Sequence, residues 1–471
     1  MDFYFRAASV LDRVDAKHGS VKGLLASLPD KDRKRTAALV IETLKYRPVL
    51  TDVIVASQLL KHEKKITSQN LALLLVHDLL LASSGIQAGD GPIKQAVVRH
   101  KTRLNSEFQR VKVKRGVKDN EELVLTADAR AGNIPRYVRV NTLKWTVEEA
   151  IATYKENGFE LGDLSKPRQI AKDAHIPNLL IFPAQTSFQD DPAFISGRVI
   201  LQDKASCFPA VVLAPPASDD ACVIDATAAP GNKTSHLSAL MRGKGTLIAF
   251  ERDSRRFKTL KNMLAKAGCK NVSPRNADFL STDPKDGAFA NVTHILLDPS
   301  CSGSGIMNRL DHLLEAEREA DKDQESARLA KLASFQLLMI RHAMKFPAVK
   351  KIVYSTCSVH VTEDECVVLQ ALKSSEATTH GFVLAPRTDV LPTWSRRGKR
   401  DIFLDNEAAE SVVRCSPGED ATNGFFVSCF VRHEARKRKA EIEEDCNLNL
   451  PQKKKPRKKK KNGGGSRSSI E

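Results

Sequence analysis

Two cysteines stand at the predicted ends of neighbouring buried strands. Cys301 lies in residues 298–305, a loop rich in Ser and Gly that follows an apolar run, and Cys357 follows the apolar run 351–356. Because the carboxyl ends of parallel strands share one edge of a sheet, we expect both thiols to lie there beside Asp298. A free cysteine is most often a buried apolar side chain, but two of them in polar loops, next to an acid, indicate catalysis.

The chemistry that needs two thiols and an acid is methylation of a pyrimidine at C5. A thiolate that adds to C6 makes C5 nucleophilic, which is covalent catalysis, and an acid such as Asp298 near N3 stabilises the adduct. After methyl transfer the C5 proton must leave and the first thiol must be expelled, and a second thiol can assist. The target base must also be turned out of any helix. The residues themselves leave open which cysteine attacks.

A methyl-donor site is predicted at residues 222–234, where an apolar run, a turn of small residues and a helix start follow one another. This is the opening unit of a doubly wound sheet, and free N–H groups at a helix start favour a carboxylate-bearing ligand. Neither the dinucleotide nor the P-loop glycine pattern is present. Acids follow three successive strands: Asp225, then Glu251, suited to ribose hydroxyls, and Asp278, suited to an adenine amino group. That spacing favours S-adenosylmethionine over a dinucleotide.

The elements that position these residues alternate between strand and helix from Cys222 onward, which predicts a parallel α/β sheet. We expect a Rossmann-like class I methyltransferase domain that ends in an antiparallel hairpin. Thr362 and Glu365 are predicted to form a capping box at the start of a helix over 362–372. The predicted strands and helices of this domain are strands 222–225, 245–250, 271–272, 294–298 and 351–357, helices 254–267, 328–346 and 362–372, and the hairpin 414–417 with 424–431.

Two smaller modules precede this domain. The first carries apolar residues at helical spacing, and the second is a small α/β module with strands expected at 135–142, 178–182 and 199–202 and a capping box from Thr146 to Glu149. The predicted boundaries are 1–130 for the helical domain, 131–200 for the small module, 201–435 for the methyltransferase domain and 436–471 for a disordered basic tail.

The charge of the chain indicates a polyanionic partner. The net charge is +17, and the forty residues from Arg432 onward account for fourteen basic and six acidic side chains, so the rest remains basic. Eight of the nine residues from 453 to 461 are Lys or Arg, which is typical of a nuclear address or an RNA-binding arm. The basic runs 99–103 and 110–115 are either solvated helix faces or surfaces for phosphates. The nine cysteines show no metal or disulfide spacing, and no apolar run is long enough to span a membrane.

The chain from 136 to 431 resembles the RsmB/Nop/Sun family of RNA cytosine-C5 methyltransferases. The matching motifs are residues 139–142, 228–234, 298–305, 354–358 and 424–426. The resemblance implies that Cys357 is the nucleophile, that Cys301 releases the product and that Asp298 faces the cytosine, with Lys233 positioning donor or base. The residues implied to line the S-adenosylmethionine site are Thr227, Ala228, Ala229, Pro230, Gly231, Asn232, Lys233, Glu251, Arg256, Asp278 and Asp298.

Two departures from the commonest family motifs resemble its eukaryotic branch, which acts on large-subunit rRNA. Asn232 follows Gly231, and Ser300 follows Pro299, where most members have Gly and Pro, while Thr227 stands where many have Cys. The helical part looks NusB-like and the small module RRM-like. The resemblance therefore implies an rRNA substrate within a pre-60S particle and a place in the nucleus and nucleolus. We expect a monomer that needs no metal and no membrane.

Two other functions compete with this one. A non-catalytic ribosome-assembly factor would also be basic, but it would have no reason to keep donor-binding motifs. A DNA cytosine methyltransferase would take its nucleophile from the Cys301 motif. The second cysteine, the N-terminal modules and the absence of a large recognition insert disfavour this reading.

Overall fold

The computed structural model describes residues 1–433 except 17, 19–20, 124–133, 308–321 and 404. The predicted basic tail over 436–471 and the end of the helical domain after Leu123 therefore lie outside the described residues. Within the described part, no helix is both long enough and apolar enough to cross a bilayer.

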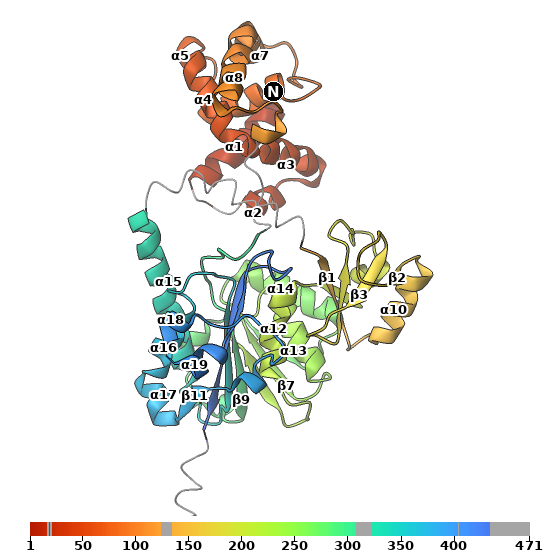
Figure 1. Ribbon diagram of the computed structural model, residues 1–471, viewed down its shortest axis with the longest axis vertical. Coiled ribbons are helices and arrows are strands. Elements are labelled where there is room, and N and C mark those ends of the chain that lie inside the picture. Colours follow the sequence, from red (N-terminus) through yellow and green to blue (C-terminus); the bar gives the residue numbers. More distant parts are fainter. Residues whose placement is uncertain (17, 19–20, 124–133, 308–321, 404, 434–471) are drawn as a thin grey trace, which may run out of the picture.

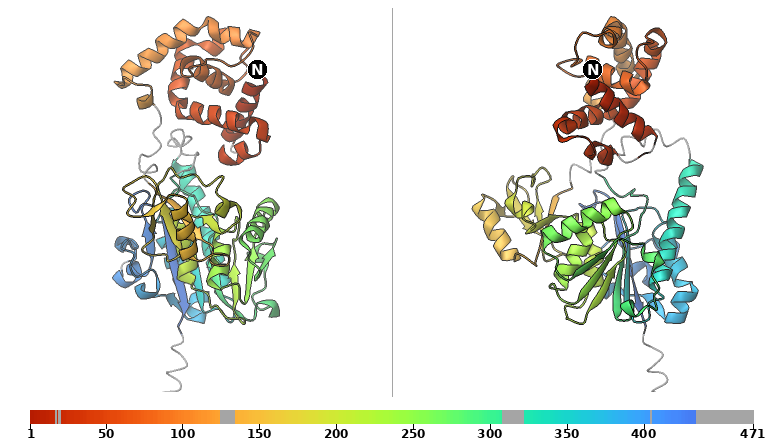
Figure 2. Two further views of the ribbon diagram at one scale, coloured as in Figure 1. Left: turned by 90° about the vertical axis from the view of Figure 1, so that its right-hand side faces the viewer. Right: turned by 180° about the vertical axis from the view of Figure 1, so that it is seen from behind.

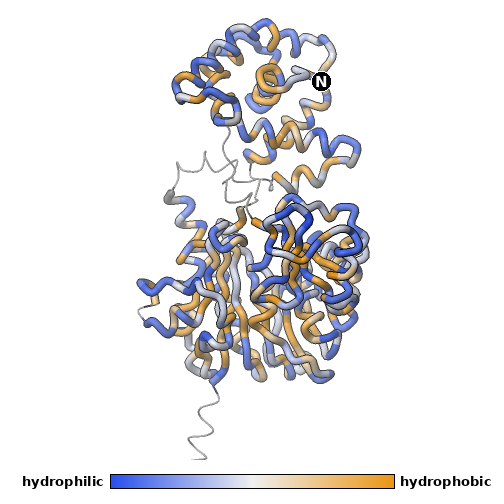
Figure 3. Tube along the Cα trace, turned by 45° about the vertical axis from the view of Figure 1, so that its right-hand side comes forward, coloured by the Kyte–Doolittle hydropathy of each residue, from blue (hydrophilic) through white to orange (hydrophobic). Residues whose placement is uncertain are grey.

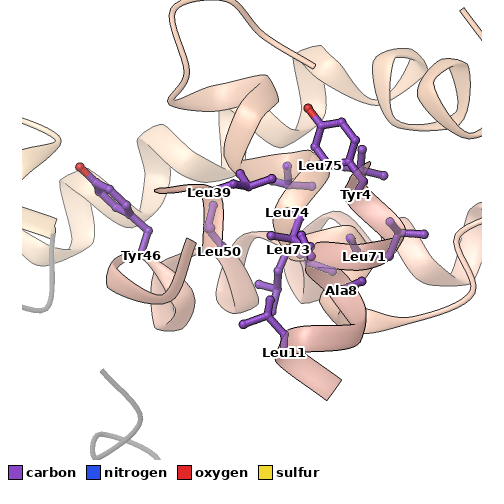
Figure 4. Close-up of a cluster of buried hydrophobic side chains, with 14 of the residues drawn as sticks. Tyr4, Ala8, Leu11, Leu39, Tyr46, Leu50, Leu71, Leu73, Leu74 and Leu75 are labelled. Atoms are coloured by element: carbon purple, nitrogen blue, oxygen red, sulfur yellow. The ribbon is translucent and has the colours of Figure 1, made fainter. Parts of the chain in front are cut away.

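The N-terminal part is helical, as predicted. Its core gathers side chains such as Leu11, Leu50 and Leu73 from different helices into one apolar cluster (Figure 4). Helix α6 is apolar nearly all round because it runs through this core, and Ser68 caps it by accepting a hydrogen bond from the Leu71 N–H at 3.1 Å. The helices are α1 (Asp2–Asp15), α2 (Val21–Ala26), α3 (Asp30–Lys45), α4 (Arg47–Ser57), α5 (Leu59–His62), α6 (Gln69–Leu80), α7 (Pro92–Arg99), α8 (Lys101–Arg115) and the 3₁₀ turn η1 (Glu121–Leu123).

The small module is a five-stranded sheet with two helices, in the order β2-β3-β4-β1-β5. The predicted capping box of α10 is present, because Thr146 and Glu149 each accept a hydrogen bond from the other's backbone N–H. Three strands were predicted, and β2 and β3 were missed. Strand β2 has only two residues, both exposed, and β3 has four residues of which only one is buried. The elements are β1 (Arg136–Val140), α10 (Val147–Glu156), β2 (Glu160–Leu161), β3 (Gln169–Lys172), β4 (Leu179–Phe182), α11 (Pro192–Ile195) and β5 (Val199–Leu201).

Both faces of the module's sheet are covered. On one face Val138 packs with Tyr154 of α10, and on the other Tyr137 and Leu179 share a cluster with Phe208 of α12 (Lys204–Leu213). The face by which an RRM-like sheet would contact RNA is therefore buried against the large domain, which lies beside the module in all views (Figure 2).

The large domain contains an eight-stranded mixed sheet in the order β11-β13-β10-β9-β6-β7-β8, with β12 also paired to β13. The five strands β10, β9, β6, β7 and β8 are parallel, and β13 runs antiparallel to its neighbours, which confirms the predicted sheet and its terminal hairpin. The strands are β6 (Cys222–Asp225), β7 (Thr246–Phe250), β8 (Val272–Arg275), β9 (Val292–Leu297), β10 (Lys351–Thr356), β11 (Phe382–Leu384), β12 (Val413–Cys415) and β13 (Phe425–Arg432).

Helices cover both faces of this sheet (Figure 1). Successive residues of a strand point to opposite faces, so Val223 packs with α12 and α13 while Ile224 packs with α15 and α16. The central strands are rich in apolar residues and the outer helices expose polar ones (Figure 3). The remaining helices are α13 (Asn232–Leu240), α14 (Ser254–Ala267), α15 (Lys322–Ala343), α16 (Glu365–Leu372), α17 (Ser375–His380), α18 (Arg400–Phe403) and α19 (Asn406–Glu410).

Two predicted helix starts are wrong. Helix α15 begins at Lys322 rather than at 328. Helix α16 begins at Glu365 rather than at Thr362, and its N-cap residue, Asp364, makes no side-chain capping bond. The Glu365 carboxylate instead accepts hydrogen bonds from Arg414 on β12, with Oε1 2.6 Å from Nε. A buried charge pair has displaced the local capping box, because an ionised buried group requires a partner.

Candidate active site

The strand order brings the predicted site residues to one edge of the large sheet. Moving from β10 to β8, the carboxyl ends present Cys357, then Cys301, then the 226–231 loop, then Glu251 and Asp278. The thiols and the predicted donor residues therefore lie on adjacent strands, as the sequence predicted.

The two thiols are in contact. The Cys301 and Cys357 sulfur atoms are 3.0 Å apart and both side chains are partly exposed. The hydrogen bond to Cys357, together with burial, raises the pKa of the Cys301 thiol. This shift favours the protonated form of the Cys301 thiol.

Asp298 and Lys233 form an ion pair beside the thiols. Asp298 Oδ2 accepts a hydrogen bond from Lys233 Nζ at 2.7 Å, and Oδ1 accepts one from Ser355 Oγ at 2.7 Å. Burial alone would lower the pKa of Lys233, but the Asp298 carboxylate raises it. Lys233 and Asp298, both predicted site residues, thus form a close pair at this edge of the sheet.

The turn after β6 is fixed by short hydrogen bonds. Asp225 accepts them from the Thr227 N–H at 3.3 Å and from the Thr234 hydroxyl at 2.8 Å, and burial raises the pKa of Asp225 to about 6. Thr227 in turn accepts from the Asp298 N–H at 2.9 Å, which ties the turn to the Cys301 loop. The Ala228 N–H donates to the Phe250 carbonyl at 2.9 Å.

Gly231 is required by packing as well as by backbone geometry. Its φ is +113°, and an added Cβ would lie 3.1 Å from Met263 Cγ and 3.3 Å from Leu260 Cδ1 on α14. The small residue thus lets α14 approach the turn. Helix α13 begins at Asn232. The N–H groups of its first residues have no partner within the helix, so they suit an anionic ligand.

The other residues predicted to bind the methyl donor differ in their burial and in their hydrogen-bond partners. Glu251 is buried at the end of β7, and Arg256 links it to the turn, with Nη1 3.4 Å from Glu251 Oε2 and Nη2 2.7 Å from the Ala229 carbonyl oxygen. Arg256 therefore holds the turn in place. Asp278 accepts from the Leu280 N–H at 3.0 Å and stays 38 % exposed.

Arg139 contributes to the site from the small module, in a role that the sequence did not reveal. It is fully buried, and its Nη2 donates to the Asn232 carbonyl at 3.2 Å and to the Ser235 hydroxyl at 2.8 Å, while Nε donates to Gln202 Oε1 at 2.7 Å. Burial lowers the pKa of Arg139 to about 10. A charged residue within an apolar alternating strand was the available signal.

Lys204 lies in a buried ion pair with Asp173, with Nζ 2.7 Å from Oδ2, and over the Trp394 ring. Its ammonium group therefore has a local carboxylate partner. Within the described residues, no group of three His, Cys, Asp or Glu side chains is placed to hold a metal ion.

Comparison with known families covers most of the chain. The model described as 16S rRNA methyltransferase RsmB/F matches residues 210–431. Two models described as the N-terminal and ferredoxin-like domains of NOL1/NOP2/Sun domain family member 5 match residues 34–124 and 134–202.

Curated relatives extend over nearly the full length. The 25S rRNA (cytosine-C(5))-methyltransferase rcm1 of Schizosaccharomyces pombe is 44% identical over 433 residues, covering 91% of each chain. The 28S rRNA (cytosine-C(5))-methyltransferase of Mus musculus is 41% identical over 445 residues, covering 92% of each.

Solved structures share the fold at low identity. The crystal structure titled PH0851 has a TM-score of 0.60 at 20% identity and covers 91% of this chain and 97% of its own. A methyltransferase homolog protein from Pyrococcus horikoshii has a TM-score of 0.51 at 22% identity and covers 80% of this chain and 99% of its own.

Proposed function

Because the chain belongs to the RsmB/Nop/Sun family of RNA cytosine-C5 methyltransferases, in its eukaryotic large-subunit rRNA branch, we propose that it transfers a methyl group from S-adenosylmethionine to C5 of a cytosine in large-subunit rRNA. The observation that carries the proposal is the contact between the Cys301 and Cys357 sulfur atoms beside the Lys233–Asp298 pair. A binding protein has no use for two thiols at such an edge.

The first step is addition of the Cys357 thiolate to C6 of the flipped cytosine. A C–S bond forms, and the electron pair of the C5–C6 double bond moves toward C5 and N3, which makes C5 nucleophilic. Hydrogen bonding from the Lys233–Asp298 pair stabilises the charge that builds at N3. C5 then takes the methyl group that S-adenosylmethionine supplies.

The second step returns the enzyme to its starting state. Once the Cys357 sulfur is bound to carbon, Cys301 passes its proton to water. The Cys301 thiolate then accepts the C5 proton, the C–H electron pair restores the C5–C6 double bond, and Cys357 leaves as a thiolate. Atoms and charge balance, and Cys301 is the release group.

The donor site consists of the predicted residues along β6, β7 and β8. The N–H groups at the start of α13 suit the donor's carboxylate, the buried Glu251 suits the ribose hydroxyls, and Asp278 suits the adenine amino group. The 226–231 turn is held against these positions by Arg256. The chain thus supplies a complementary group for each part of the donor.

We assign the binding of the RNA substrate to basic side chains on the protein surface. Helix α8 exposes Lys101, Arg103 and Lys114 to solvent, which suits phosphate contacts, whereas Arg110 and Arg115 are paired with Glu107 and Asp52. Arg99 is instead engaged with Glu63, with Nη2 2.9 Å from Oε1, so only part of the first basic run is available.

The wider context of the protein is proposed on the same basis. We assign the rRNA substrate to a pre-60S particle in the nucleolus, and the enzyme acts as a monomer without metal or membrane. The boundaries 1–130, 131–200, 201–435 and 436–471 stay our division of the chain. The separate apolar clusters of the helical domain and the small module support the first two.

Bisulfite sequencing of total RNA from a deletion strain tests the proposal. Loss of one methylated cytosine in large-subunit rRNA is expected, with return of the mark when the wild-type gene is restored but not with Cys357→Ala. A strain that keeps every rRNA 5-methylcytosine, or full rescue by Cys357→Ala, would overturn it. A donor-binding measurement by calorimetry separates the enzyme from a scaffold, which would not bind S-adenosylmethionine.

A further inference from the structure

We infer that two of three consecutive buried acids, Glu363 and Asp364, position the two active-site thiols through separate hydrogen bonds, while the third, Glu365, holds the segment in place. This inference rests on the proposed function, since it assigns one step of that reaction to Glu363 and one to Asp364. We refer to residues 363–365 as the acidic clamp. All three side chains are fully buried although they lie in the segment that follows the Cys357 loop.

Glu363 acts on the Cys301 loop together with Gln336 of α15. The Ser302 N–H donates to Glu363 Oε1 at 2.9 Å, and Gln336 Nε2 donates both to the Ser300 carbonyl at 3.1 Å and to Glu363 Oε1 at 3.0 Å. The two peptide groups that flank the Cys301 Cα are therefore held by one hydrogen-bonded pair. Because both groups are fixed, the direction of the Cys301 side chain is set.

Asp364 acts in the same way on Cys357. Its Oδ1 accepts from the Thr356 hydroxyl at 2.6 Å, and that hydroxyl oxygen accepts from the Ser358 N–H at 3.3 Å. Residues on both sides of Cys357 are thus tied to one carboxylate. The Glu363 and Asp364 carboxylates thus hold the two loops through different partners. The loops are also joined directly, since the Gly305 N–H donates to the Cys357 carbonyl at 2.9 Å and Ser302 Oγ lies 3.2 Å from Ser358 Oγ.

Glu365 and Arg414 fix the clamp itself. Arg414 donates from Nη2 to Asp364 Oδ2 at 2.9 Å and to Glu365 Oε2 at 2.6 Å, and from Nη1 to the Val359 carbonyl at 3.2 Å. On the other side, the Tyr354 hydroxyl on β10 donates to Gln336 Oε1 at 3.0 Å. The same hydroxyl also donates to the Glu363 carbonyl at 2.5 Å, so the clamp is anchored to β12 and β10.

This arrangement predicts different kinetic defects for the two anchors. Loosening the Glu363–Gln336 pair should misplace only the release thiol, so the Cys357–RNA adduct forms but resolves slowly. Loosening the Thr356–Asp364 bond should misplace only the attacking thiol, so adduct formation itself slows. A displacement of about 1 Å in a reacting group costs on the order of 100-fold in rate.

The test compares single turnovers of the full chain on an rRNA fragment, with labelled donor and denaturing gels that separate adduct from free methylated RNA. Glu363→Gln and Gln336→Met should accumulate adduct, with release about 100-fold slower, and Thr356→Val should slow adduct formation without accumulation. Glu376→Gln is the matched control, because Glu376 also binds α15, through Arg341 Nε at 2.9 Å, but at a position remote from the clamp.

Each outcome has one meaning. Adduct that resolves at the wild-type rate in both Glu363→Gln and Gln336→Met, or equal slowing of both steps in either, would overturn the inference. Should Glu363→Gln fail to fold in a thermal melt, Gln336→Met carries the test alone. Cys301→Ala separates this failure from that of the enzyme mechanism: if it accumulates adduct and the clamp variants do not, only the clamp is wrong.

Discussion

The active-site edge has two halves that are built in different ways. The donor half, along β6, β7 and β8, is positioned by contacts close in sequence, such as those of Asp225 with Thr227 and Thr234. The thiol half, along β9 and β10, depends on side chains distant in sequence, such as Gln336 and Arg414. The turn of the donor half is shaped mainly by its own residues, with Arg139 and Arg256 as longer-range supports, whereas each thiol loop is held mainly by side chains of other elements.

The sharpest way to break this comparison is to remove the attacking atom. Cys357→Ser should lower methylation by about 10⁴-fold and abolish the covalent complex with RNA containing 5-fluorocytosine, because a hydroxyl does not ionise at neutral pH. Donor affinity, measured by calorimetry, should be unchanged, since the donor half is separate. If Cys301→Ala abolished the trapped complex and Cys357→Ser did not, the roles of the two thiols would be reversed.

The next largest effect concerns the charge that supports the thiol half. Arg414→Met leaves the Asp364 and Glu365 carboxylates buried without their cation, which should reduce the free energy of unfolding by about 3–5 kcal/mol. Denaturant unfolding of the full chain measures it. Arg396→Met is the control, because Arg396 pairs with Asp420 at an exposed site and should lose less than about 1 kcal/mol. Equal losses of unfolding free energy in the two variants would show that the buried ion pairs of Arg414 stabilise the protein no more than the ion pair of Arg396.

The donor half should respond to pH through Asp225. Its pKa is about 6 in the folded chain and 3.8 as the ordinary value, so the folded state holds the proton more tightly than the unfolded state. This contribution to stability is fully present below pH 3.8 and is lost as the pH rises through 6, by about 3 kcal/mol in total. Wild type should therefore lose stability relative to Asp225→Asn between pH 4 and 6. Parallel stability curves for the two proteins would contradict the raised pKa.

A smaller effect is expected at Gly231. Gly231→Ala places a Cβ at a φ of +113° and against Met263, which should cost about 1–3 kcal/mol and weaken donor binding. Gly287→Ala is the control, since a Cβ there meets nothing within 4 Å. Thermal melts with and without donor distinguish the two. A Gly231→Ala protein that binds donor normally would show that the turn tolerates adjustment.

The same contrast explains what could be predicted from the sequence. The βα turn was predictable because its residues are near one another in the chain. The strand-end acids and the cysteine pair were predictable because parallel strands bring their carboxyl ends to one edge of a sheet. The acidic clamp was not, because Glu365 looked like half of a capping box with Thr362, and only the fold brings Arg414 to it. Arg139 was similarly hidden, since its partners Gln202 and Ser235 lie on other elements.

The small module's doubly covered sheet has a consequence for how the protein must be handled. Tyr137 and Leu179 share an apolar cluster with Phe208, and Asn141 Nδ2 donates to the Ala267 carbonyl at the end of α14 at 2.8 Å. A truncation that starts at the large domain would expose the apolar side chains of this cluster to water. It would also remove the hydrogen bonds that Arg139 donates to Asn232 and Ser235. The small module and the large domain should therefore melt as one cooperative unit, and a truncation that removes the module should lower the melting temperature and the solubility of the large domain.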